Sequence, residues 1–220
     1  MRHVSGLWLG LVVLSTGCPR HPPAPTWGGT DAVRTWAKAP AVVEYVRVNM
    51  ADEMALPDKP LRAERNGPAV VDGRLLYDVI TYDITEQPIV VEAVRHFYGP
   101  EGFGYLGTLL EDGTLEAWDP PQVVLPPDPH VGQTWAATHL KGERSSDRSC
   151  EISDSDLCDG GLVSVCDSVL PEGRIVLRDH FCPEVGWAGF EALVLRDGVP
   201  TVRMWSTQVV VDGTALPDPG

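Results

Sequence analysis

Runs of β-branched and aromatic residues, separated by turn residues, follow one another from Ala41 to the end of this 220-residue chain. Helical periodicity is nearly absent there, and such spacing is typical of antiparallel all-β domains. Asp112-Gly113 and Asp197-Gly198 are predicted hairpin turns, because aspartate tolerates positive φ and glycine adopts it freely. The pattern predicts strands at 41–49, 74–83, 88–98, 103–110, 114–118, 133–140, 147–153, 161–169, 174–182, 190–196 and 200–211.

Several of these strands are apolar on both faces. In the segment 190–196, for example, Phe190 and Ala192 alternate with Leu193, also apolar. A flat sheet with one wet face would alternate apolar and polar residues more cleanly. We therefore expect a strongly curved antiparallel sheet or partly closed barrel, one domain over 41–220, with at most one or two short helices.

Five prolines fall within residues 119–129. Proline lacks the backbone N–H that a central strand donates to its neighbour. This segment is therefore predicted to be an extended crossover or hinge between the two halves of the domain.

The N-terminus has the layout of a signal peptide. Arg2 supplies a positive charge, and the apolar stretch at 4–14 is shorter than the roughly 20 residues that a membrane-spanning helix needs. Residues 14–18, Leu-Ser-Thr-Gly-Cys, resemble the lipobox of bacterial lipoproteins, in which a peptidase cuts before a lipid-modified cysteine. We expect removal of residues 1–17 and lipidation of Cys18. The alternative is an ordinary secretory signal with an incidental cysteine, which also exports the chain.

Residues 18–40 are predicted to be a tether rich in proline and glycine, with a short helix at 31–39. Pro19 stands where an aspartate would retain lipoproteins of enteric bacteria at the inner membrane, which favours the outer membrane. The formal net charge of −14 argues against nucleic acid and anionic lipid headgroups as partners.

Four cysteines remain once Cys18 carries lipid, and an exported protein meets an oxidising compartment. Sequence alone allows three connectivities. A hairpin of strands 147–153 and 161–169 sets Cys150 opposite Cys166. The next strand, 174–182, runs back and brings Cys182 to the loop that carries Cys158. We therefore predict the disulfides Cys150–Cys166 and Cys158–Cys182.

Two short motifs point to a family. The segment Leu125-Pro126-Pro127 precedes Val131-Gly132-Gln133-Thr134-Trp135, and Phe181-Cys182-Pro183-Glu184-Val185-Gly186-Trp187 follows about fifty residues later. This arrangement, over about residues 70–211, resembles uncharacterised exported β-rich lipoproteins labelled TapB-like, although Glu184 replaces the first glycine of their second motif. The resemblance implies no catalytic residues.

Catalytic and metal-binding motifs are weak. The sequence has no Gly-x-Ser-x-Gly elbow, no Cys-x-x-Cys pair, and scattered histidines at positions 96, 130, 139 and 180. Asp154, Asp156 and Asp159 form an acidic loop that lacks the spacing of an EF-hand, so we expect a solvated turn; calcium is the alternative. No cofactor is predicted.

The favoured interpretation is a non-enzymatic envelope lipoprotein that binds a partner protein or an amphiphile. One alternative is a surface hydrolase with dispersed carboxylates or histidines. The other is a carbohydrate-binding module, which requires an exposed aromatic platform. Its candidate residues are Trp118, Trp135, Trp187 and Trp205. Core packing is the favoured role of these rings, and Trp135 and Trp187 are predicted to be largely buried.

Overall fold

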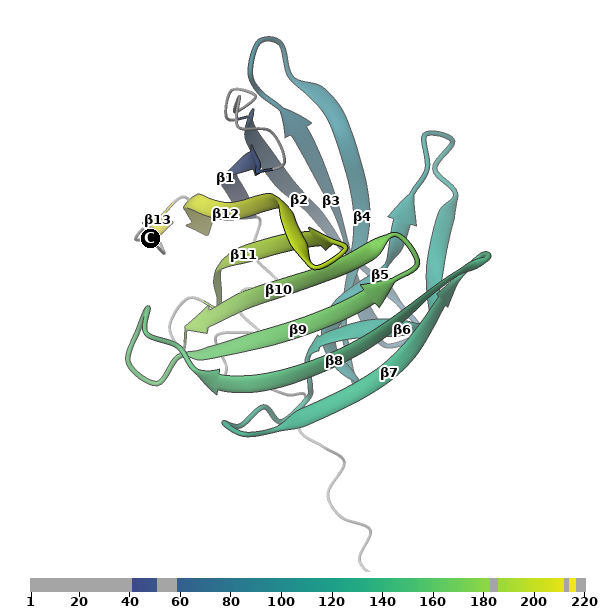
Figure 1. The fold of residues 1–220 in the computed structure, drawn as a ribbon, viewed down its shortest axis with the longest axis vertical. Coiled ribbons are helices and arrows are strands. Elements are labelled where there is room, and N and C mark those ends of the chain that lie inside the picture. The colour runs from purple at the N-terminus through teal and green to yellow at the C-terminus, as the bar shows by residue number, and fades with distance from the viewer. Residues whose placement is uncertain (1–40, 51–58, 183–185, 212–213, 217–220) are drawn as a thin grey trace, which may run out of the picture.

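The protein is a closed antiparallel barrel. The computed structural model describes residues 41–50, 59–182, 186–211 and 214–216, which form strands and turns without a helix. The strands are β1 (Ala41–Asn49), β2 (Lys59–Val71), β3 (Arg74–Asp83), β4 (Ile89–Gly99), β5 (Gly102–Leu109), β6 (Leu115–Leu125), β7 (Thr134–Lys141), β8 (Arg144–Asp154), β9 (Leu162–Leu170), β10 (Gly173–Cys182), β11 (Gly186–Arg196), β12 (Val199–Val211) and β13 (Thr214–Leu216). Each strand pairs with the next, and β1 also pairs with β12, which closes the ring (Figure 1). The predicted all-β curved fold is confirmed.

The predictions for residues 1–40 concern a part of the chain that the structure does not describe. The signal peptide, Cys18 and the tether with its short helix lie outside the described residues. In the described part of the chain, no helix is long and apolar enough to cross a membrane.

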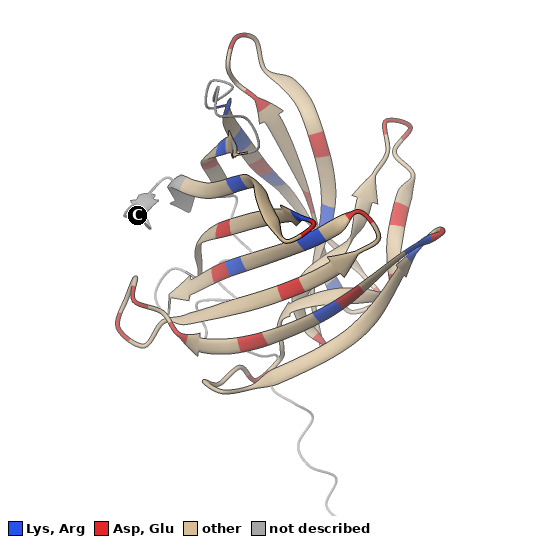
Figure 2. Cartoon of the chain, in the orientation of Figure 1, with Lys and Arg blue, Asp and Glu red and all other residues tan. Residues whose placement is uncertain are grey.

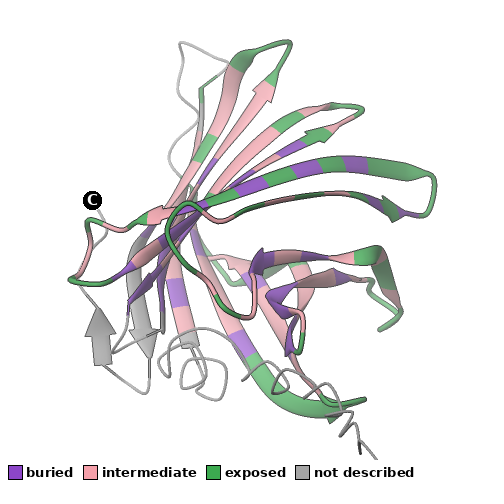
Figure 3. Ribbon diagram, turned by 90° about the horizontal axis from the view of Figure 1, so that it is seen from below, coloured by how far each residue is buried: buried purple, intermediate pink, exposed green. Residues whose placement is uncertain are grey.

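The two ends of the barrel differ. At one end, which we call the mouth, lie the hairpins β3–β4, β5–β6, β7–β8, β9–β10 and β11–β12, and several of them extend well beyond the barrel body (Figure 1). At the other end, which we call the floor, the chain enters β1 at Ala41. Figure 3 shows buried residues gathered where the strands converge and exposed residues towards the hairpin tips.

A tight turn connects β11 to β12 as predicted. Asp197 and Gly198 have φ values of 51° and 78°, the positive values that a two-residue hairpin turn needs. Asp72 and Gly73 form a similar turn between β2 and β3, with φ values of 49° and 78°.

Strand β2 was not predicted from the sequence. Pro60, Gly67 and Pro68 interrupt it, and its charged residues obscure the alternation. Its inner face nonetheless buries Leu61 and Arg65, and its pairing with β3 shifts register around the Gly67-Pro68 peptide. Interior positions of a closed barrel accept polar side chains, which a hydrophobic pattern cannot reveal.

The prediction of a proline-rich crossover at 119–129 was wrong over its first part. Strand β6 continues through Pro120 and Pro121 to Leu125. Its pairing with β5 jumps from Ala117 to Gln122, so a bulge takes up the prolines without breaking the sheet. Towards β7 the ladder is nearly absent, since only one residue pair, Asp119 with Leu140, joins the two strands.

Side chains replace the missing ladder between β6 and β7, a junction that we call the seam. His139 Nδ1 donates to the carbonyl of Pro120 at 2.7 Å, and Trp135 Nε1 donates to the carbonyl of Val123 at 3.3 Å. Ser164, from β9, donates to the carbonyl of Val124. These bonds satisfy carbonyls of β6 that the ladder leaves unpaired.

The floor contains the main hydrophobic core and both disulfides. Its fully enclosed side chains include Phe103, Leu125 and Ile152. Cys150 bonds Cys166 directly across β8 and β9, and Cys158 bonds Cys182 between the β8–β9 loop and the end of β10. Both predicted pairings are confirmed.

Candidate ligand-binding cavity

The barrel encloses a cavity because twelve strands make a ring wider than side chains can fill. Eight strands already give an interior just wide enough for side chains to occupy. Here a cavity of about 400 Å³ remains, within the range of small-molecule sites. Most of its lining is apolar or aromatic, including Val43, Tyr45, Ala63, Val79, Val94, Phe103, Tyr105, Trp118, Leu177, Phe190 and Met204.

A second cavity, of about 920 Å³, adjoins the first on the side of the mouth. The two share lining residues, among them Tyr45, Glu92 and Met204. Apolar side chains again dominate; they include Val90, Val91, Leu110, Val194 and Val202. The two cavities therefore share part of their walls, with the larger one nearer the mouth.

Arg148 is the most unusual group on the cavity wall. It is only 5% exposed, and its Nη1 donates to Gln122 Oε1 at 3.0 Å. Its guanidinium lies 6.0 Å from the centre of the Tyr105 ring. Burial lowers the pKa of Arg148, which still leaves it charged. Its Nη2 has no hydrogen-bond partner among the described residues.

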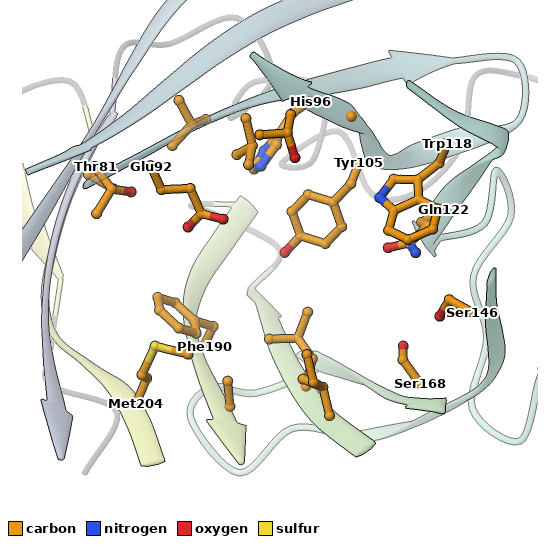
Figure 4. Close-up of a pocket in the computed structure, with 18 of the residues that line it drawn as sticks. Thr81, Glu92, His96, Tyr105, Trp118, Gln122, Ser146, Ser168, Phe190 and Met204 are labelled. Atoms are coloured by element: carbon orange, nitrogen blue, oxygen red, sulfur yellow. The ribbon is translucent and has the colours of Figure 1, made fainter. Parts of the chain in front are cut away.

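Two serines stand beside Arg148 on the same wall. Ser146 precedes it by two residues on β8, so both side chains point inward, and Ser168 lies on β9. Figure 4 shows Ser146 and Ser168 facing one another into the open space, with the Tyr105 hydroxyl and Glu92 carboxylate pointing in from the opposite wall. Within the described residues, the buried hydroxyl of Ser146 lacks a hydrogen-bond partner.

His96 and Arg65 occupy the β2–β4 side of the cavity. The His96 ring packs edge-on against Tyr105, with centroids 4.6 Å apart, and the Arg65 guanidinium lies 4.8 Å from the Tyr77 ring centre. Desolvation, with the nearby charge of Arg65, lowers the pKa of His96 to about 3. The imidazole is therefore neutral at physiological pH.

Asp179, on β10, is buried, with 2% exposure. Its Oδ1 accepts a hydrogen bond from Trp187 Nε1 at 2.9 Å, and no partner for Oδ2 lies among the described residues. Desolvation raises the pKa of Asp179 to about 6, against the smaller opposing effects of Trp187 and Arg148.

Lys141 is already engaged near the mouth. Its Nζ lies 5.1 Å from the Trp118 ring centre, donates to Thr108 at 3.0 Å and pairs with Glu116 at 3.3 Å. The positive charges on the cavity lining are those of Arg65, Lys141 and Arg148, against the carboxylate of Glu92. Figure 2 shows acidic residues at the hairpin tips instead, so a cation-rich interior lies within a protein of net charge −14.

The residues considered as a metal site do not converge. Asp154, Asp156 and Asp159 are exposed, as expected of a solvated turn. Across the described part of the chain, no group of three or more His, Cys, Asp or Glu side chains is placed to hold a metal ion.

The four tryptophans differ in burial. Trp187 is buried as predicted, while Trp135 is half-buried and so less enclosed than predicted. Trp118 and Trp205 are also half-buried, and a cation covers each, since Arg203 lies 5.1 Å from the Trp205 ring centre. These four rings form no exposed platform for a sugar.

The groups considered for a hydrolase lie apart. Glu92 and His96 line the same cavity, but they are four positions apart on β4, roughly 13 Å along a strand. Ser155 Oγ lies 3.1 Å from His180 Nδ1, outside the cavities described above, and also accepts the backbone N–H of Leu157. His130 lies in an exposed loop, and His139 belongs to the seam.

Sequence reasoning missed the inward polar residues of β8. The signal was nonetheless present, because Cys150 must face Cys166 and Ile152 is apolar. Residues two and four positions earlier, Arg148 and Ser146, share that face by strand periodicity.

Comparisons with family models, with curated proteins and with solved structures gave no match to this chain.

Proposed function

We propose that this protein is a non-enzymatic lipoprotein of the bacterial envelope that binds an amphiphile inside its barrel. The observation that carries the proposal is the cavity of about 400 Å³, largely apolar, with a few charged and polar groups at its wall. Concave apolar sites with a few oriented polar groups are the usual form of small-molecule sites.

The exposed side chains at the mouth also favour an apolar ligand. Ile89, Val90 and Val91 are 65%, 56% and 53% exposed at the start of β4, Leu110 is exposed on the neighbouring β5–β6 hairpin, and Val199 is exposed at the β11–β12 turn of the same end. Exposed apolar side chains gathered at one place mark surfaces where apolar ligands pass or bind. Burial of each methylene of a ligand chain contributes about 0.8 kcal/mol.

We further propose that lipid on Cys18 holds the barrel at the membrane, with residues 18–40 as its tether and the outer membrane as its address. The signal layout, the resemblance to the lipobox and the resemblance to the TapB-like family support this placement. An anchored barrel of this kind would keep an amphiphile out of water between membrane encounters.

Filling the cavity should abolish ligand binding. Ala63→Trp places an indole in the cavity, and we expect at least a tenfold weaker affinity for the neutral fluorescent probe N-phenyl-1-naphthylamine, because the ligand loses its space. Fluorescence titration measures this effect. Ala136→Trp, which makes the same change at an exposed position of β7, is the matched control. No saturable binding by the unaltered protein, or equal binding by Ala63→Trp, would contradict the proposed function.

Removing the anchor should release the protein. We expect Cys18→Ala to appear in the soluble fraction or to accumulate uncut, because no lipid can be attached. Cell fractionation with mass determination of the N-terminus measures both outcomes. A fully processed variant that stays with the membranes would show that Cys18 is not the anchor.

A further inference from the structure

Two buried hydrogen-bond donors on β8 lack partners among the described residues. They are Nη2 of Arg148 and the hydroxyl of Ser146, and both residues line the cavity. A buried donor left without a partner costs about 1–3 kcal/mol, and more when it is charged. An oxygen atom of a ligand in the cavity would remove this penalty.

The charge of Arg148 favours an oxyanion at this place. Asp179 is the nearby carboxyl group, but its Oδ1 accepts from Trp187, and no hydrogen bond joins it to Arg148. Gln122 engages Nη1 through a neutral oxygen. A buried guanidinium with one unpaired nitrogen, Nη2, is suited to a carboxylate or a phosphate.

The position of Arg148 within the barrel fixes the direction of the ligand. Its Nε lies 3.4 Å from Sγ of Cys150, so it stands directly on the disulfide at the floor. The lining at the other end of the interior is mostly apolar, with Val90, Val91 and Val202 at the mouth, beside the exposed charges of Arg47 and Glu111. A tail that pointed towards the floor would lie against the charged guanidinium of Arg148, whereas a tail at the mouth contacts valine side chains.

Resting on the proposed function, we propose that Arg148, assisted by Ser146, binds the oxyanion of a single-chain amphiphile, which enters the barrel charged end first and leaves its tail at the mouth. The shared chemistry is an oxyanion on an apolar chain, whether a carboxylate or a phosphate monoester.

Two probes of similar shape test this assignment. The unaltered full chain should bind 1-anilinonaphthalene-8-sulfonate more tightly than N-phenyl-1-naphthylamine, which lacks the sulfonate. Arg148→Met should lower the affinity for the anionic probe by about ten- to a hundredfold, the range for a hydrogen bond to a charged group. Its affinity for the neutral probe should stay within about twofold of that of the unaltered protein. Displacement by dodecanoate, dodecyl phosphate and dodecanol distinguishes carboxylate, phosphate and uncharged chains.

Arg47→Met is the matched control, because Arg47 is an exposed arginine lining the mouth. It should leave the preference for the anion unchanged; loss of the preference in Arg47→Met but not in Arg148→Met would reverse the orientation and overturn the proposal. Should Arg148→Met not fold, Ser146→Ala replaces it, with an expected loss for the anion alone. Equal affinity of the unaltered protein for both probes refutes the internal oxyanion site while leaving the apolar cavity intact. Binding of neither probe refutes the proposed function itself.

Discussion

Replacing Cys150 and Cys166 together by alanine is expected to lower the free energy of unfolding by about 3 kcal/mol. The bond closes a loop with a sequence separation of 16, and the loss of a crosslink of this span frees the unfolded chain by about that amount. For a domain of this size, the melting temperature should fall by about 6–12 °C.

Chemical denaturation of both proteins measures the difference. The double alanine variant of Cys158 and Cys182, which opens a loop with a separation of 24, should be destabilised to a similar extent. Non-reducing peptide mapping confirms the pairing in the starting material. An unchanged midpoint after loss of the Cys150–Cys166 bond would mean that the barrel does not depend on this crosslink.

Asp179→Asn is expected to stabilise the protein at pH 7 by about 3 kcal/mol. Burial raises the pKa of the Asp179 carboxyl from its ordinary value of 3.8 to about 6, so the folded state binds its proton more tightly than the unfolded state does. Stability from this group is therefore fully present below pH 3.8 and is lost as the pH rises to about 6. Two pKa units correspond to about 3 kcal/mol.

The amide removes this penalty while keeping an acceptor for Trp187 Nε1. We expect the difference between Asp179→Asn and the unaltered protein to be near zero at pH 3.5, to grow between pH 4 and 6, and to be constant above pH 7. Urea unfolding across this range measures it. A destabilised Asn variant at pH 7, or a difference independent of pH, would show that Asp179 is ionised in the fold without cost.

The disulfide pairing could be predicted because strand register is a local property. Once the chain turns near Cys158, antiparallel pairing with a side-chain period of two places Cys150 opposite Cys166. The same periodicity located most other strands, since their β-branched runs end at clear turns such as Asp197-Gly198.

Other parts of the fold escaped prediction for two physical reasons. Strand β2 has inward polar residues such as Arg65, which line the cavity. Because these inward positions are polar, the strand lacks the alternation of apolar and polar residues by which strands are predicted. In β6 the prolines predict a break, yet the bulge after Ala117 and the side chains of His139 and Trp135 keep the segment in the sheet.

The proposed binding site depends on ring closure, which no single segment encodes. Arg148 and Ser146 become interior only when β1 meets β12, because the same face of an open sheet would be exposed to water. The acidic loop at Asp154, which the sequence made more conspicuous, lies at the floor end and away from this interior.

The seam between β6 and β7 bears on how rigid the ring is. Elsewhere around the described ring of twelve strands, neighbours share long backbone ladders, which resist stretching as a unit. At the seam, rotatable side chains such as His139 and Trp135 span the junction beside a single backbone pair. We therefore expect the circumference to widen most easily along this line, by rotation of a few side chains, so that the proposed cavity would accept ligands of different width without loss of a strand ladder.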